Sequence, residues 1–280
     1  MVKKPWKKVL YEEQDYPDNY VDESFLDELR KNVYTRTYHF WNVSDAAGTV
    51  SQQVSSLCLF VMTFVYMKKE LISPSMLFLI SAVVTSISYC IYIMTCWDQR
   101  TKNVKDDLKS LILFLAFSFG LSPVLRTLTD SISTDTIYAM TVFMLGMNLL
   151  MHDYGASGAI VSKAASLNTA IFGSVCLASR LPSSWHAFVT VIMAVEIFAL
   201  FPLFREQVKV FIPGSHFMMT WGLLVVALVS VVTISIFAGI FFLLAQTAVI
   251  FLCPYWLVRL QRFKDNIHGP WDEAVISTAE

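Results

Sequence analysis

Charged side chains are scarce in this sequence of 280 residues, and that scarcity bounds its class. Asp, Glu, Lys and Arg make up 15% of the residues, whereas soluble globular domains carry roughly 25%. From Phe217 to Val258 no residue is charged. The net charge of −1 gives no electrostatic reason to expect nucleic acid or another polyanion as a partner. The composition excludes an ordinary soluble domain and predicts an integral membrane protein.

Motifs for catalysis and cofactor binding are also missing from the sequence. The ten glycines form no G-x-G-x-x-G or Walker A pattern, and no H-E-x-x-H, G-x-S-x-G or spaced His/Cys cluster occurs. The five cysteines fall inside apolar runs, which is typical of buried thiols. His152 and Asp153 are neighbours, but adjacent side chains on a helix point about 100° apart. We therefore assign no catalytic residue, no metal ligand and no cofactor.

Long apolar runs dominate what is present. A helix that crosses the hydrocarbon core of ~30 Å uses about 20 residues, so the stretch from Phe217 to Val258 suits two spans. Thr233 to Ser235, followed by Gly239, offer the place for a tight turn between them. The third span is short and contains Gly120 and Pro123, so we expect it to be kinked or partly re-entrant.

The sequence predicts an all-α, polytopic membrane protein with about eight transmembrane helices. The predicted spans are 50–67, 76–97, 110–125, 134–152, 159–178, 184–204, 217–235 and 237–257.

Polar ends flank the apolar middle and give three regions. They are a cytosolic N-terminal segment (1–49), a transmembrane helical domain (50–257) and a cytosolic tail (258–280). The N-terminal segment has no short apolar core followed by small residues, so we expect the first span to direct membrane insertion. Asp22 is placed to cap a short amphipathic helix near 22–33, with Phe25 and Leu29 on one side. Such a helix either lies at the membrane interface or packs on a partner subunit, and the sequence leaves both open.

The distribution of Lys and Arg predicts the orientation. Sixteen basic residues fall on the side of the N-terminus and four on the other, which places both termini in the cytosol for an even number of spans. The sequon Asn42-Val43-Ser44 then faces the cytosol, where it stays unmodified.

Three charged residues near or inside the spans are candidates for a binding site, because charge is costly at depth in a membrane. Glu196 lies near the middle of the sixth span, and Lys163 lies about one turn inside the fifth. If neighbouring spans bring them together, they either line a cavity for an anionic lipid headgroup or form a structural ion pair. Arg126, in the polar loop after the third span, is placed to bind a phosphate, to bridge Asp130 or to cap a helix end.

Seven strings, in one order along nearly the whole chain, carry a resemblance to a known family. They are Lys8-Val-Leu-Tyr-Glu, Pro17-Asp-Asn-Tyr-Val-Asp, Ser122-Pro-Val-Leu-Arg-Thr-Leu-Thr, Ser133-Thr-Asp-Thr-Ile-Tyr-Ala-Met, Asp153-Tyr-Gly-Ala, Val175-Cys-Leu-Ala-Ser-Arg-Leu-Pro and Asn266-Ile-His-Gly-Pro-Trp-Asp-Glu-Ala. Together they resemble the PIG-C family, whose members are subunits of the phosphatidylinositol N-acetylglucosaminyltransferase complex. The apolar spans between the strings match this family only in character.

The resemblance implies a multi-pass protein of the endoplasmic reticulum membrane. It implies work in a complex that transfers N-acetylglucosamine from UDP-N-acetylglucosamine to phosphatidylinositol, the first step of glycosylphosphatidylinositol (GPI) anchor synthesis. In that family the glycosyl transfer is attributed to another subunit, PIG-A. We therefore expect a non-catalytic subunit with a scaffolding role, and with membrane phospholipid, phosphatidylinositol among them, as a candidate ligand. The resemblance supplies no catalytic residue.

The polar segments on the cytosolic side are the predicted contacts to the catalytic subunit. The residues concerned are Phe25 and Leu29 near the N-terminus and His268, Gly269, Pro270, Trp271 and Asp272 in the tail. Two other classes of function stay open from the sequence. One is a stand-alone integral-membrane lipid transferase, which needs a cluster of acid–base residues at one depth. The other is a lipid transporter or scramblase, which typically shows repeated halves with paired broken helices.

Overall fold

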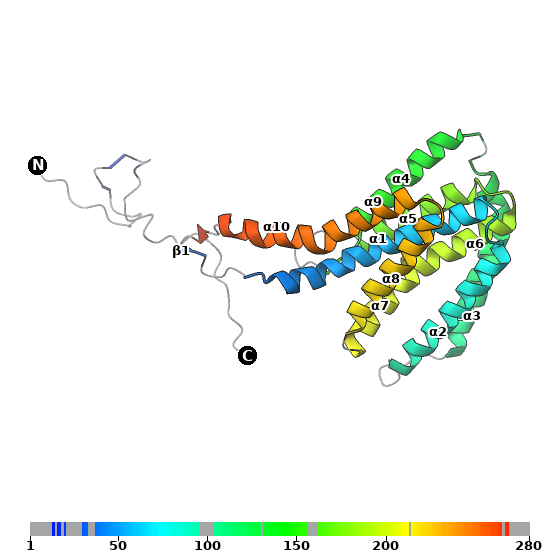
Figure 1. Ribbon diagram of the computed structural model, residues 1–280, viewed down its shortest axis with the longest axis horizontal. Helices are drawn as coiled ribbons and strands as arrows, with labels where there is room; N and C mark the ends of the chain where they lie inside the picture. Colours follow the sequence, from blue (N-terminus) through cyan, green and yellow to red (C-terminus); the bar gives the residue numbers. More distant parts are fainter. Residues whose placement is uncertain are drawn as a thin grey trace, which may run out of the picture. The chain divides into compact units, whose positions relative to one another are not determined.

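Helices make up nearly all of the structure. The computed structural model describes residues 13–14, 16–17, 20, 30–32, 37–95, 104–129, 131–155, 162–212, 214–264 and 267–268. Within them, Figure 1 shows the α-helices α1 (Phe40–Lys68), α2 (Pro74–Thr95), α3 (Val104–Thr127), α4 (Thr134–Met151), α5 (Lys163–Ala178), α6 (Ser184–Val195), α7 (Phe201–Phe211), α8 (Ser215–Val232), α9 (Ile236–Thr247) and α10 (Cys253–Leu260). Shorter helical turns are η3 (Glu196–Leu200), η4 (Ala248–Leu252) and η5 (Gln261–Phe263), and the strands are β1 (Arg30–Lys31) and β2 (Ile267–His268). The chain divides into two compact units, residues 41–254 and residues 1–40 with 255–280.

Helices of the length and composition that a membrane requires occur at most of the predicted spans. In the described part of the chain six are long and apolar enough: α1, α2, α3, the run Ser184–Phe211, α8 and the run Ile236–Phe263. Helices α4 and α5 stand at the fourth and fifth predicted places but are not among the six. At 1.5 Å per residue, α5 is about 24 Å long, less than the ~30 Å hydrocarbon core. The prediction of an all-α polytopic membrane protein is confirmed.

The turn between the last two spans also lies where the sequence predicts it. Helix α8 ends at Val232 and α9 begins at Ile236, with Ser235 as its N-cap. The Ser235 hydroxyl accepts a hydrogen bond from the backbone N–H of Ala238 at 3.4 Å. A Cβ on Gly239 would lie 2.5 Å from a methyl carbon of Val232, so the close return of the chain needs a glycine there.

The third predicted span is wrong in its length. Helix α3 runs 24 residues and passes through Gly120 and Pro123 as one continuous helix. Proline has no N–H to donate to the carbonyl four residues earlier, which belongs to Phe119. The Ser122 hydroxyl donates to that carbonyl at 2.9 Å instead. A serine side chain thus satisfies the backbone acceptor that Pro123 leaves, and the helix continues.

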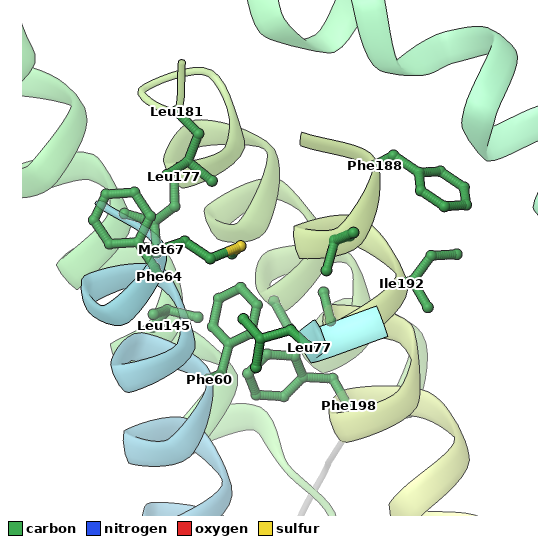
Figure 2. Packing of buried hydrophobic residues seen from close by; sticks show 13 residues of the cluster. Phe60, Phe64, Met67, Leu77, Leu145, Leu177, Leu181, Phe188, Ile192 and Phe198 are labelled. Atoms are coloured by element: carbon green, nitrogen blue, oxygen red, sulfur yellow. The ribbon is translucent and has the colours of Figure 1, made fainter. Parts of the chain in front are cut away.

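Helix α1 is the most buried of the long helices. Half of its most apolar window (50%) is buried in the protein, against 11% for α2 and for α3. Figure 2 shows the apolar part of the core, where Phe60 of α1 faces Phe198 with their ring centres 5.2 Å apart. Leu77 of α2 packs in the same cluster. Aliphatic and aromatic side chains from five or more helices close this end of the bundle around α1.

The short amphipathic helix predicted near 22–33 is wrong where the structure tests it. Arg30 and Lys31 form strand β1, which pairs antiparallel with β2 of the tail: Arg30 lies opposite His268, and Lys31 opposite Ile267. A helix this short is marginal by itself, and here the backbone of its expected last turn bonds to the tail instead. Residues 21–29 lie outside the described residues.

The predicted partner contacts fall mostly beyond what the structure describes. Phe25, Leu29, Gly269, Pro270, Trp271 and Asp272 lie outside the described residues, and of His268 only the backbone is described. The first helix begins at Phe40, earlier than the predicted boundary between a polar segment and the spans at 49 and 50.

Candidate functional site: a buried polar core and two cavities

A row of polar side chains is buried along α1, the helix with the most protein around it. Its members are Ser44, Ser51, Gln52, Gln53, Ser55 and Ser56, each less than 9% exposed, together with Gly48. Amides and hydroxyls inside a membrane protein need hydrogen-bond partners, because lipid supplies none. Neighbouring helices provide partners for Ser44, Ser51, Gln52, Ser55 and the amide nitrogen of Gln53. Ser56 donates to the carbonyl of Gln52 in its own helix, and Oε1 of Gln53 has no partner among the described residues. The interhelical bonds tie the unit 41–254 together.

Gln52 is the centre of the largest group. Its amide nitrogen donates to the Thr220 hydroxyl of α8 at 2.7 Å and to the backbone carbonyl of His216 at 3.2 Å. Its amide oxygen accepts from Nη1 of Arg205 at 3.4 Å. His216 also reaches α1, where its Nε2 lies 2.9 Å from the carbonyl of Asp45. Helices α1, α7 and α8 meet in this group.

Arg205 is a buried cation, with 4% of its surface exposed. Its Nη2 lies 3.0 Å from Nε2 of His152. A guanidinium only donates, so that ring nitrogen accepts and the proton of the neutral imidazole is on Nδ1. Within the part of the chain that the structure describes, no carboxylate forms an ion pair with Arg205. Two neutral acceptors, on Gln52 and His152, hold its charge.

The loop after α4 carries ionisable groups that this arrangement perturbs. Burial, and then the charge of Arg205, lower the pKa of His152 to about 4. Burial raises the pKa of Tyr154 to about 12, and the Tyr154 hydroxyl donates to the carbonyl of Leu149 at 2.6 Å. The two rings meet edge to face, 5.1 Å apart. At neutral pH His152 is therefore uncharged beside a charged arginine, which makes it an acceptor and not an acid.

Two more groups join α1 to other helices through side-chain amides. Gln53 donates to Asn148 of α4 at 3.0 Å, and Asn148 donates to the carbonyl and the hydroxyl of Ser166 in α5, both at 2.9 Å. In the second group, Ser51 donates to Oε1 of Gln246 in α9 at 2.7 Å. Asn148, Gln53 and Gln246 are each at most 2% exposed. These amides fix the register of four helices against one another.

The predicted pair of Lys163 and Glu196 does not form. Lys163 is the first residue of α5, 68% exposed, and its ammonium lies 3.4 Å from Asp153 and 3.6 Å from Glu206. Glu206 follows Glu196 by ten residues, about 15 Å along a helix, so Lys163 meets the end of that helix and not its middle. A hydrogen bond from the Gly155 N–H, and then Lys163, lower the pKa of Asp153. Lys163 thus belongs to an exposed ion-pair group beside the buried Arg205 network.

Glu196 lies in a groove of about 420 Å³ between α1, α2, η3 and α8. It begins the π-helical turn η3, and the side chains of Thr85 and Ser81 line the same groove. The remaining lining is mainly aliphatic, with Val84 of α2 and Val226 of α8 as examples. A carboxylate therefore faces an apolar groove in the middle of a membrane-spanning helix.

Arg126 is exposed in the last turn of α3, where a cation suits the negative end of a helix. Asp130, its predicted bridge, lies outside the described residues. The arginine that holds the following loop is Arg180. Its Nη2 donates to the carbonyl of Thr129 at 2.6 Å and to that of Ile132 at 2.9 Å. Phosphate binding by Arg126 stays a prediction.

A second cavity, of about 400 Å³, lies between the first turns of α1 and α8 and the turn η4. Aromatic rings line it, namely Trp41, Phe217, Trp221 and Phe251. Asp45 and His216 are its ionisable members. His216 contacts the backbone carbonyl of Asp45 and not its side chain. The Asp45 carboxylate forms no ion pair within the described residues. Rings with a carboxylate beside them form a surface for a ligand that has both C–H faces and hydroxyl groups.

Some of these buried residues could have been found in the sequence. They were missed because only isolated charges inside the predicted spans were taken as candidates. By sequence, Arg205 counts among the loop charges on the cytosolic side, but it lies inside a helical run from Ser184 to Phe211. Gln52, Asn148 and Gln246 are amides within apolar stretches. Polar residues at such positions mark interior contacts in membrane proteins, by the same reasoning that singles out Glu196.

The fold and these sites define a polytopic α-helical membrane protein whose helices are joined by a hydrogen-bonded polar core. The GPI2 family, described as phosphatidylinositol N-acetylglucosaminyltransferase, matches residues 6–272 of the chain. The chain belongs to this family, and the resemblance drawn from the sequence is confirmed.

Relatives from distant organisms match along nearly the full length. The C subunit of phosphatidylinositol N-acetylglucosaminyltransferase from Mus musculus is 48% identical over 275 residues, which cover 97% of this chain and 93% of the mouse protein. The C subunit from Homo sapiens is 47% identical with the same coverage. The phosphatidylinositol N-acetylglucosaminyltransferase GPI2 subunit of Schizosaccharomyces pombe is 36% identical over 288 residues, covering 98% of this chain and 87% of that protein. No solved structure is significantly similar to the chain.

Proposed function

We propose that this protein is a non-catalytic membrane subunit of the complex that transfers N-acetylglucosamine from UDP-N-acetylglucosamine to phosphatidylinositol, the first step of GPI-anchor synthesis. The observation that carries the proposal is the nearly complete match to relatives named as the C subunit of this transferase. A subunit name, and a match that covers both chains, favour the same role in the same assembly. A catalytic subunit that resembles PIG-A then performs the transfer, and the complex lies in the endoplasmic reticulum membrane with both termini of this chain in the cytosol.

The arrangement of the polar side chains supports a scaffolding role. Gln52, Asn148, Arg205 and Gln246 are buried, and each forms a side-chain hydrogen bond to another helix. A catalytic site needs acid and base groups that converge on a space where substrate binds. These groups instead hydrogen-bond to neighbouring helices, which fixes the positions of the helices. Such a rigid unit suits the holding of partner spans and of an acceptor lipid beside a cytosolic transferase.

We further propose that the aromatic cavity of Trp41, Trp221 and Asp45 holds the headgroup of the acceptor lipid. An inositol ring presents C–H faces to indole rings and hydroxyl donors to a carboxylate, and the cavity has both. The first turn of α8 lines it without a side-chain cap, and the positive end of a helix favours the phosphodiester of such a lipid. This position replaces the predicted headgroup site between Lys163 and Glu196, whose two members lie apart.

Activity of the purified single chain tests the catalytic part of the proposal. In detergent with phosphatidylinositol, the chain alone should produce no N-acetylglucosaminyl lipid from UDP-N-acetylglucosamine, and the complex isolated through the same chain should produce it. Turnover by the single chain would identify a stand-alone lipid transferase and refute the scaffolding role. A complex without this chain that keeps full activity would refute it as well.

Lipid binding tests the headgroup position. Variants Trp221→Ala and Asp45→Asn should weaken retention of phosphatidylinositol by the purified chain about tenfold, as the loss of one good contact of ~1.4 kcal/mol does. Lys163→Met, in the exposed ion-pair group, is the matched control and should retain the lipid. The reverse result would return the headgroup to Lys163. Equal losses for phosphatidylcholine would show an interfacial lipid contact in place of an inositol site.

A further inference from the structure

The groove that contains Glu196 is unusual because its walls suit lipid and its carboxylate does not. Val84, Ile80 and Leu200 line it and are 57%, 46% and 45% exposed, so apolar surface is open along the groove. Helix α2, one of its walls, has only 11% of its most apolar window buried. The helices of this chain leave this face uncovered within the described residues.

Glu196 lies at a depth where a charge is costly. It is the thirteenth residue of the helical run Ser184–Phe211, which has 28 residues, and so lies roughly 20 Å from either end. The hydroxyls of Thr85 and Ser81 line the same groove as its carboxylate. They are neutral, and no cation of the described residues forms an ion pair with it. A carboxylate fixed at mid-membrane depth without a counter-charge calls for a cation from outside this chain.

The backbone at this position gives a second, independent observation. From Glu196 to Leu200 the helix changes to π-helical winding, while the segments before and after it are α-helical. π-helical turns are rare inside α-helices, and they are frequently found at functional sites. Here the turn begins at the residue whose side chain enters the groove.

We propose that the groove receives a transmembrane helix of another subunit, and that a lysine or arginine of that helix pairs with Glu196. This inference rests on the proposed role as a subunit of the transferase complex. Charge complementarity selects the occupant. The charged groups of phospholipids lie at the membrane surface, whereas Glu196 lies near the middle of its helix, and a basic side chain on a partner's span reaches that depth. The apolar walls then pack against the aliphatic side chains of the same helix.

Photo-crosslinking in native membranes tests the occupant directly. A photoreactive amino acid replaces Val84 or Val226 in the tagged full chain, and Val142 of α4, which is 73% exposed but lies outside the groove, serves as the control position. The expected product is a peptide from a membrane span of another subunit, with Lys or Arg within two turns of the crosslinked residue, and absent from the control. Adducts with lipid alone at both groove positions would overturn the proposal.

Charge variants test the pair. Glu196→Gln keeps the size and the hydrogen-bonding capacity of the side chain but removes the charge, so the crosslinked subunit should be retained about tenfold less on detergent extraction. Asp135→Asn, an exposed carboxylate in the first turn of α4, is the control and should retain it. Glu196→Lys should release the subunit, and exchange of the partner's basic residue for Glu should restore it.

The outcomes separate this inference from the proposed function. If wild-type chain carries transferase activity through purification and Glu196→Gln retains every subunit as well as wild type does, the groove is not the docking site and only this inference fails. If the wild-type chain itself brings down no transferase activity, the proposed subunit role fails with it.

Discussion

Replacement of Arg205 by leucine is the most direct test of the polar core. The guanidinium donates to Oε1 of Gln52 and to Nε2 of His152, and both acceptors are at least nine-tenths buried. Leucine fills part of the volume and donates nothing, so each acceptor loses its partner away from water. An unsatisfied buried acceptor costs about 1–3 kcal/mol, which gives roughly 2–6 kcal/mol for the two.

One opposing effect reduces that sum. The buried guanidinium has no carboxylate partner among the described residues, and removal of a poorly neutralised buried charge recovers part of the free energy spent on its burial. We therefore expect Arg205→Leu to lower the free energy of unfolding by about 2–4 kcal/mol. For a chain of this size 1 kcal/mol corresponds to about 2–4 °C, so the Tm in detergent should fall by roughly 4–16 °C.

Thermal unfolding followed by tryptophan fluorescence measures this change. Lys209→Leu removes a cation from an exposed position on the same helix and serves as the matched control, with a shift of at most about 2 °C. The double variant of Arg205→Leu and Gln52→Leu should lose less stability than the sum of the single variants, because Oε1 of Gln52 is already without its donor once Arg205 is gone. Strict additivity, or an Arg205→Leu variant as stable as Lys209→Leu, would refute the reasoning.

Three further predictions concern packing, pH and the tail. Gly48→Ala should lower stability by about 1–3 kcal/mol, because its Cβ would lie 2.9 Å from Nε2 of His216, whereas Gly146→Ala, with nothing within 4 Å, should be neutral or stabilising. Comparison of the two Tm values checks this, and equal shifts would contradict the close approach. The pKa of His152 is lowered to about 4 from its ordinary 6.5, so the unfolded chain takes up the proton first. Stability should accordingly be constant above pH 6.5 and fall as the pH drops from 6.5 towards 4, and His152→Gln should flatten the pH dependence of Tm in that window. Deletion of 266–280, which removes strand β2, should release the catalytic subunit on mild detergent extraction. A complex that stays intact would show that the tail is not a contact to that subunit.

The class of the protein and the positions of most helices could be predicted from the sequence, because both depend on local composition. The forty-two residues from Phe217 to Val258 are long enough for two spans and too apolar for anything else, and the turn at Thr233 to Ser235 follows from the small polar residues there. Family membership could also be predicted, because each of the seven sequence segments that resemble the family is contiguous in the chain. These features need no knowledge of which helices touch.

Local patterns failed where a residue's state depends on a neighbour. Gly120 and Pro123 suggested a broken third span, but Ser122 supplies the hydrogen bond to the Phe119 carbonyl and α3 continues. The segment near 22–33 has the composition of a helix. Its residues Arg30 and Lys31 nevertheless pair with strand β2, which begins 236 residues after Lys31. A propensity is a small free energy, and one tertiary hydrogen bond or strand partner overrides it.

The sequence by itself determined that the chain enters a membrane as helices, which family it belongs to, and that Glu196 is a charge at depth. Only the tertiary structure decided that Lys163 pairs with Asp153 and Glu206, that Arg205 is buried between Gln52 and His152, and that Glu196 faces an open groove. The reason is that hydrophobicity sets which segments are helices, whereas the rotation and the vertical register of each helix are set by side chains on its neighbours. Those partners lie far apart in the sequence, and no local pattern records them.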